Sequence, residues 1–155
     1  MSVQKLDNPP SFYLSLPTTS AESARIFYLS LGFQHIPQYS DADTVALRLP
    51  GANANICLMV HQPARFKTFI RPDTEIVDAE KYTEGIYSVA VKSKEEVDGF
   101  LAKAKEAGGK LDPFVMPGYG AECGMYTRSW TDLDGHIWEA TCMLEGGCTQ
   151  TESSS

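Results

Sequence analysis

Apolar and polar residues alternate along this chain in a pattern that occurs twice. In the first half, residues 11–16 alternate with the two-residue period of a strand, and apolar residues then recur at helical spacing through 24–31. In the second half, residues 86–91 have the strand pattern and residues 97–104 have the helical one. Both halves therefore begin with the same predicted strand and helix.

Three short strands are predicted after each helix. They cover 33–37, 44–49 and 55–61 in the first half, and 110–114, 124–130 and 136–143 in the second. Neither β-α-β-β-β unit can bury a sheet face alone. Placed side by side, the two units form a curved mixed sheet with the helices on its convex face, which leaves the concave face for a ligand. The pattern thus predicts an α+β protein.

Both helices begin with the pattern of a capping box, in which a Ser or Thr caps the first turn and a Glu follows three residues later. This pattern places the N-caps at Thr19 and Ser93. Gly32 and Gly108 follow the last helical residues, where glycine takes a positive φ without the steric cost of a Cβ. The helix boundaries are therefore predicted at both ends.

These elements predict a single domain, 11–143, between an N-terminal extension, 1–10, and a tail, 144–155. The first module, the crossover and the second module are expected at about 11–61, 62–84 and 85–143. The tail is rich in Gly, Ser and Thr, and we expect it to be disordered.

Composition and charge exclude several classes of partner. Of the 155 residues, 43% are apolar, which suffices for a globular core, and the net charge of −7 argues against a nucleic-acid or anionic-membrane surface. No stretch approaches the ~18 apolar residues that span a bilayer, and the start of the chain lacks the pattern of a secretory signal. We therefore expect a cytoplasmic protein whose scattered cysteines are free thiols, namely Cys57, Cys123, Cys142 and Cys148.

The strongest local signal is the segment 130–139, with the sequence WTDLDGHIWE. Asp and Gly between two apolar runs predict a tight hairpin, in which Gly135 takes a positive φ. The strand after the turn alternates, so Glu139 points to the face opposite His136 and Trp138. His136 is expected to bond to a loop, and Trp138 to lie in the core.

Glu139 needs a partner, because an unpaired buried carboxylate costs several kcal/mol. A ligand in a wet cavity, a structural cation and a metal ion are the three alternatives. With Thr131 opposite His136 in the hairpin, Arg128 lies opposite Glu139. A register shifted by one residue places Ser129 there instead.

Taken together, the paired units, the run ARIFYLSLGF at 24–33 and the hairpin DLDGHIWE at 132–139 resemble the vicinal oxygen chelate superfamily. This group includes glyoxalase I, extradiol dioxygenases, fosfomycin-resistance transferases and bleomycin-resistance proteins. The resemblance covers about residues 10–143. It implies a protein, often a homodimer, that binds and in some members transforms a small organic molecule in the concave cavity of the sheet.

The metal enzymes of this superfamily place His, Glu or Gln ligands on the first and last strand of each unit. Carried over to this sequence, the four positions hold Tyr13, Cys57, Ile86 and Glu139. Only Glu139 is a standard ligand, so we expect no metal cofactor. The alternative is a lyase or extradiol-type dioxygenase that uses one divalent metal ion, with Glu139 as a ligand beside Tyr13, Cys57 or His61.

The candidate catalytic residues are Glu139 and Tyr126. The expected ligand pocket is lined by Tyr13, Ser15, Cys57, His61 and Arg128. Two loops have open interpretations. The basic cluster Arg65, Lys67 and Arg71 in the crossover is either solvated or grips an anionic ligand or a partner subunit, and the glycine-rich segment 116–122 is either a plain surface loop or a lid over the cavity.

Overall fold

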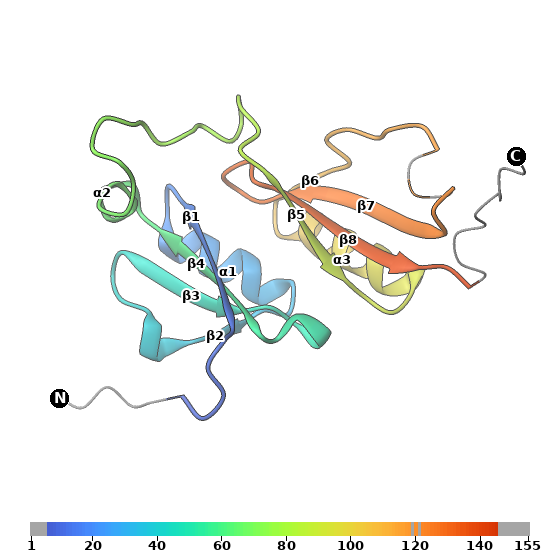
Figure 1. The fold of residues 1–155 in the computed structure, drawn as a ribbon, viewed down its shortest axis with the longest axis horizontal. Helices are drawn as coiled ribbons and strands as arrows, with labels where there is room; N and C mark the ends of the chain where they lie inside the picture. Colours follow the sequence, from blue (N-terminus) through green and yellow to red (C-terminus); the bar gives the residue numbers. More distant parts are fainter. Residues whose placement is uncertain (1–5, 119, 121, 146–155) are drawn as a thin grey trace, which may run out of the picture.

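The computed structural model describes residues 6–118, 120 and 122–145, and it has the predicted α+β architecture (Figure 1). The first module contains the helix α1 (Ala21–Ser30) and two short 3-10 helices, η1 (Pro37–Tyr39) and η2 (Gly51–Asn53). Its strands are β1 (Phe12–Pro17), β2 (Gln34–His35), β3 (Thr44–Arg48) and β4 (Ile56–His61). They form a sheet in the order β1-β4-β3-β2, in which only β1 and β4 are parallel.

The second module repeats this topology after a crossover that contains the short helix α2 (Pro63–Lys67). Its elements are β5 (Ile86–Ala90), α3 (Lys94–Glu106), β6 (Lys110–Leu111), β7 (Met125–Thr131) and β8 (Ile137–Met143). The sheet order is β5-β8-β7-β6, with β5 parallel to β8. The predicted repeat of a β-α-β-β-β unit is therefore confirmed.

Figure 1 shows the two sheets side by side, with α1 and α3 on the same side of them. Within the described residues the strands form two separate four-stranded sheets. The modules nevertheless touch, because α1 contacts α3 and the Asn53 side-chain amide donates a hydrogen bond to the Ala90 carbonyl at 2.8 Å. The faces away from the helices carry most of the candidate site residues.

The main core lies between the two helices and the two sheets. The helical stripes predicted from the sequence are buried there, with Phe27 and Tyr28 from α1 and Leu101 from α3. Tyr28 packs edge-on against Trp138 at 5.9 Å between ring centroids, and Trp138 stacks on Trp130 at 6.4 Å. Trp138 thus joins the second sheet to the first helix, and its predicted place in the core is confirmed.

The helix boundaries follow the sequence pattern with one correction. The N-cap of α1 is Ser20, whose hydroxyl accepts from the Ser23 amide at 3.2 Å, and not Thr19. Thr19 is unavailable because its amide and its hydroxyl both donate to the carboxylate of Asp134 in the other module. Ser93 caps α3 as predicted, and Gly32 has the expected positive φ of 90°.

Two of the predicted strands are much shorter than expected. The strand expected at 33–37 is reduced to β2, and the one expected at 110–114 ends at Leu111. The next residue, Asp112, has a positive φ of 45°, which turns the chain out of the sheet. Within the described residues, no helix is long and apolar enough to cross a membrane. The predicted disordered tail falls mostly on 146–155, outside the described residues, and Cys148 lies there too.

Candidate functional site

The hairpin between β7 and β8 has the register in which Ser129, and not Arg128, lies opposite Glu139. This is the second of the two registers that the sequence left open. Thr131 does not pair with His136, because the Asp132 amide donates to the His136 carbonyl at 3.1 Å within the loop. Thr131 therefore pairs with Ile137. Since a shift of one residue exchanges the two faces of a strand, Arg128 lies on the opposite face from Glu139.

Glu139 points away from the helices, as its alternation with the buried Trp138 predicts. Its Oε2 accepts a hydrogen bond of 2.6 Å from the hydroxyl of Ser88 on the neighbouring strand β5. The side chain is half-buried, and the described residues offer it no ion pair. The carboxylate therefore keeps hydrogen-bonding capacity for a group that is not part of the protein.

A recess of about 360 Å³ opens beside Glu139. Hydroxyl groups line its floor, including Ser129 opposite Glu139, and Thr127, which shares a hydrogen bond of 2.9 Å with Thr141. Its outer wall is the loop after β6, from which the exposed side chains of Phe114, Val115 and Met116 face the recess. The recess thus combines one carboxylate, several hydroxyls and an apolar wall.

Arg128 and Tyr126 border the same recess, but their polar ends turn towards α3. The Tyr126 hydroxyl donates to Asp98 at 2.8 Å, and the Arg128 guanidinium donates to Asp98 at 3.1 Å and to Asp112 at 2.7 Å. The hydrogen bond to Asp98, with burial, raises the pKa of the Tyr126 phenol, and the hydrogen bond to Asp112 raises the pKa of Arg128. The structure does not bring the Tyr126 hydroxyl together with Glu139, so the two catalytic candidates lie on opposite faces of the sheet.

The remaining predicted pocket residues lie in the first module. Cys57 is fully buried in a small second core with Ile36 and Ala46, and burial raises the pKa of its thiol. Tyr13 packs against Tyr39 of η1 at 6.3 Å between ring centroids. Tyr13 and Cys57 therefore lie side by side in the first sheet and do not line the recess beside Glu139.

His61 is buried beneath the crossover. Its Nδ1 shares a hydrogen bond of 2.8 Å with the Thr44 hydroxyl, and its ring lies 5.0 Å from that of Phe69. Burial and the nearby Arg65 guanidinium lower the pKa of His61, so its imidazole is neutral at pH 7. Ser15 lines a separate cavity under the crossover. The seven predicted site residues are therefore distributed over several places.

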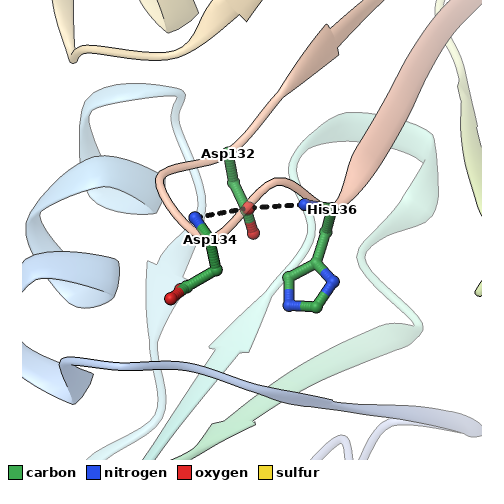
Figure 2. A group of neighbouring side chains, drawn as sticks. All are labelled: Asp132, Asp134 and His136. Carbon is green, nitrogen blue, oxygen red and sulfur yellow. Dashed lines mark hydrogen bonds between the residues drawn. The ribbon is translucent and has the colours of Figure 1, made fainter. Parts of the chain in front are cut away.

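A polar cluster that the sequence did not reveal as a unit lies in the hairpin loop (Figure 2). Asp132 Oδ1 accepts from the amides of Asp134 and His136 at 3.0 and 2.9 Å, and its Oδ2 accepts from the Tyr28 hydroxyl. Asp134 accepts from the Thr18 hydroxyl at 2.6 Å and from Thr19. These bonds tie the second module's hairpin to the first module's β1–α1 connection.

His136 completes this cluster with both ring nitrogens engaged. Nε2 donates to the Pro17 carbonyl at 2.7 Å, and Nδ1 bonds to the Glu84 carboxylate, which confirms the expected bond from His136 to a loop. Burial alone lowers the pKa of His136, but the Asp132 carboxylate, the Pro17 carbonyl and Glu84 together raise it above its usual value. His136 is therefore held as an imidazolium between the two modules.

The buried cluster also tests whether a metal ion fits. Asp132, Asp134 and His136 offer ligand atoms that lie within 4.8 Å of one another. Every one of these atoms already accepts or donates a hydrogen bond within the protein, and a charged imidazolium has no lone pair for a metal. The hydrogen bonds make the cluster a junction between the modules, and a metal ion would have to displace the proton of His136 from one of its two acceptors, the Pro17 carbonyl or the Glu84 carboxylate.

Around Glu139, the metal position of the superfamily offers an ion few further ligands among the described residues. In the described part of the chain, Glu139 belongs to no group of three His, Cys, Asp or Glu side chains that could share an ion. Cys57 is enclosed in the other module, and Ile86 supplies no ligand atom. The hydroxyl of Ser88 is the neighbour that the fold gives to Glu139.

The charge state of the two buried histidines is a direct test of this geometry. We expect His136 to titrate above pH 6.5 and His61 below it, because their pKa values are shifted in opposite directions. Stability contributed by His136 is then fully present below pH 6.5 and is lost as the pH rises through its folded-state pKa. Long-range ¹H–¹⁵N spectra of the imidazole rings across pH 5 to 9 measure both values. A neutral His136 ring at pH 6 would contradict the hydrogen-bond assignment.

Comparisons with known proteins agree on the fold. No family model matches the sequence, and a search of curated proteins finds no match. Among solved structures, a hypothetical protein from S. aureus is 25% identical, with a TM-score of 0.65 over 85% of this chain and 92% of that one.

Two further solved structures carry functional names. A glyoxalase/bleomycin resistance protein/dioxygenase family enzyme from Burkholderia phytofirmans is 18% identical, with a TM-score of 0.68 over 85% of this chain and 97% of that one. A lactoylglutathione lyase from Agrobacterium tumefaciens is 17% identical, with a TM-score of 0.58 over 86% and 95%. At such identities the likeness concerns the fold, and the chain has the glyoxalase/bleomycin resistance/dioxygenase fold of the vicinal oxygen chelate superfamily, as the sequence resemblance implied.

Proposed function

We propose that this protein binds a small organic molecule in the recess beside Glu139, without a metal ion. The observation that carries the proposal is the half-buried Glu139 carboxylate, whose described partner is a single neutral hydroxyl, that of Ser88. A partly desolvated carboxylate is stabilised by a further donor or a cation. The described residues supply no such cation, so we infer that a ligand supplies the donor or the positive charge.

The lining of the recess indicates the class of molecule. Glu139 favours a hydrogen-bond donor or a positive charge, and the Thr127 and Ser129 hydroxyls accept or donate as required. Phe114, Val115 and Met116 leave apolar surface exposed, which a ligand with an apolar body would cover. We therefore propose an amine or a hydroxylated aromatic compound as the type of ligand. The solved structures with this fold carry names that refer both to enzymes and to bleomycin resistance proteins.

Replacing Glu139 with Gln is expected to weaken binding of such ligands about tenfold or more, because the charge-assisted hydrogen bond is lost while the side-chain shape is kept. The measurement is thermal-shift screening of amines, phenols and matched carboxylic acids, followed by titration calorimetry on chelator-treated protein. Glu106→Gln on the exposed face of α3 removes the same charge and serves as the control. Equal affinity in the wild type and Glu139→Gln would place the ligand elsewhere.

The alternative from the resemblance is a lyase or dioxygenase that uses a divalent metal bound by Glu139. It predicts about one equivalent of metal per chain by elemental mass spectrometry of untagged protein, with the metal and any turnover lost together in Glu139→Ala. Ligand binding that survives chelation supports the metal-free proposal against it. The homodimer that the resemblance implies stays a prediction, which light scattering after size exclusion tests.

A further inference from the structure

A second cavity, of about 520 Å³, lies beneath the crossover and shares no lining residue with the recess beside Glu139. The end of β1, the helix α2, the segment 69–77 and the start of β5 surround it. We call it the crossover pocket. Among the side chains that define it are Ser15, Phe66, Phe69, Arg71, Val77 and Tyr87. Its size is in the range of cavities that hold small organic ligands.

The walls of the crossover pocket are largely apolar, and part of that surface faces solvent. Phe69 is 60% exposed and Val77 is 45% exposed, although both line the cavity. Phe69 is held in place by its ring contact with the buried His61. A ligand with an aromatic or aliphatic body would remove this apolar surface from water.

Among the residues that the structure describes, the charges around the crossover pocket leave the guanidinium of Arg71 without a partner. Of the lining carboxylates, Glu84 is bonded to His136, and Glu75 is paired with Lys67 at 3.2 Å. Within the described ranges, the Arg71 guanidinium has no ion pair. The Ser15 hydroxyl has no hydrogen bond there. In the described part of the chain, the pocket therefore offers two hydrogen-bond donors without partners, and each of its carboxylates is already paired.

From this combination we propose that the crossover pocket binds an amphiphilic organic anion. Arg71 binds the carboxylate or sulfonate group, since its guanidinium donates two parallel hydrogen bonds to such an anion. Phe66, Phe69 and Val77 cover the apolar body, and Ser15 donates a further hydrogen bond. This second site is independent of the function proposed for Glu139 and assigns a role to Arg71, one of the three basic residues of the crossover cluster.

A fluorescence titration with 8-anilinonaphthalene-1-sulfonate tests the proposal, because this probe is an aromatic sulfonate that brightens in apolar sites. We expect saturable binding of one equivalent. Arg71→Gln should weaken it about fivefold or more, and Phe69→Ser should weaken it as well. Lys105→Gln removes one positive charge from the exposed face of α3 and should leave the affinity unchanged. The neutral analogue N-phenyl-1-naphthylamine should bind Arg71→Gln and the wild type with the same affinity.

Glu139→Gln separates this proposal from the proposed function, because it should not change the affinity for the sulfonate. Near-ultraviolet circular dichroism of each variant confirms that the native packing is kept, since the probe also binds partly unfolded protein. Absence of saturable binding by the wild type, or equal affinity in the wild type and Arg71→Gln, would overturn the proposal.

Discussion

Gly109→Ala is expected to destabilise the protein by about 3 kcal/mol, the upper end of the usual cost of overpacking. A Cβ at this position would lie 2.5 Å from the Thr131 carbonyl oxygen and 3.0 Å from that of Ala104. Both contacts are to backbone, which cannot rotate away. The Gly109 amide also donates to the Ala104 carbonyl at 2.8 Å, so the chain is fixed from two directions.

Chemical denaturation monitored by tryptophan fluorescence measures this loss. The matched control is Gly99→Ala in the middle of α3, where an added Cβ meets nothing within 4 Å. That variant should be more stable than the wild type by about 0.5–1 kcal/mol, because alanine is the better helix former. If both substitutions changed the free energy of unfolding in the same direction, this would contradict the close approach of β7 to the end of α3 at Gly109.

Asp132→Ala is expected to cost about 3–5 kcal/mol, because it removes the acceptor at the centre of the buried junction. The variant leaves the Tyr28 hydroxyl and two backbone amides without their partner, and it removes the negative charge of Asp132 beside the imidazolium of His136. Asp132 is 5% exposed, so water does not replace the lost bonds.

Two further variants show whether the loss of stability comes from the junction or from the general packing. Asp132→Asn keeps an acceptor for the backbone amides and should recover part of the loss. Asp134→Ala removes the bonds to Thr18 and Thr19 and should weaken the contact between the modules by about 1–3 kcal/mol. Amide hydrogen exchange reads both effects residue by residue. Unchanged protection of the Thr19 amide, which donates to Asp134 at 2.8 Å, would contradict the junction in Asp134→Ala.

The order of elements was predictable because it depends on local periodicity. Period-two and helical patterns placed both helices and the repeated strands, and the residues capping α3 identified its start. The cap of α1 was misplaced by one residue because Thr19 and Ser20 are both good caps, and a contact with Asp134 decides between them. Such a contact joins residues far apart in the chain and leaves no local signal.

The candidate site was predictable only in part for the same reason. Alternation with Trp138 put Glu139 on the open face, which the structure confirms. The register that brings Ser129 opposite Glu139 depends on a single loop hydrogen bond. The local sequence does not fix this bond, so both registers stayed open and Arg128 remained a pocket candidate, although it lies on the other face. Ser88, the partner of Glu139, lies on a parallel strand from the other end of the module, so its pairing is a tertiary property.

The buried junction shows the limit of sequence patterns most clearly. The DLDGH turn was correctly predicted as a hairpin, and Gly135 has the expected positive φ, of 95°. The turn bonds to the Pro17 carbonyl, the Thr18 hydroxyl and the Glu84 carboxylate. In the sequence these three residues look like ordinary loop or strand-end residues. A motif that resembles catalytic or metal-binding chemistry therefore serves to join two modules in this protein.

We propose above all that the recess beside Glu139 binds a small organic molecule without metal. Amide and side-chain NMR of chelator-treated protein, titrated with the strongest amine or phenol from the thermal-shift screen, tests it most directly. We expect saturable shifts at Ser88, Thr127, Ser129 and Glu139 that disappear in Glu139→Gln. Shifts confined to the crossover pocket, or shifts at the recess only after a divalent metal is added, would contradict it.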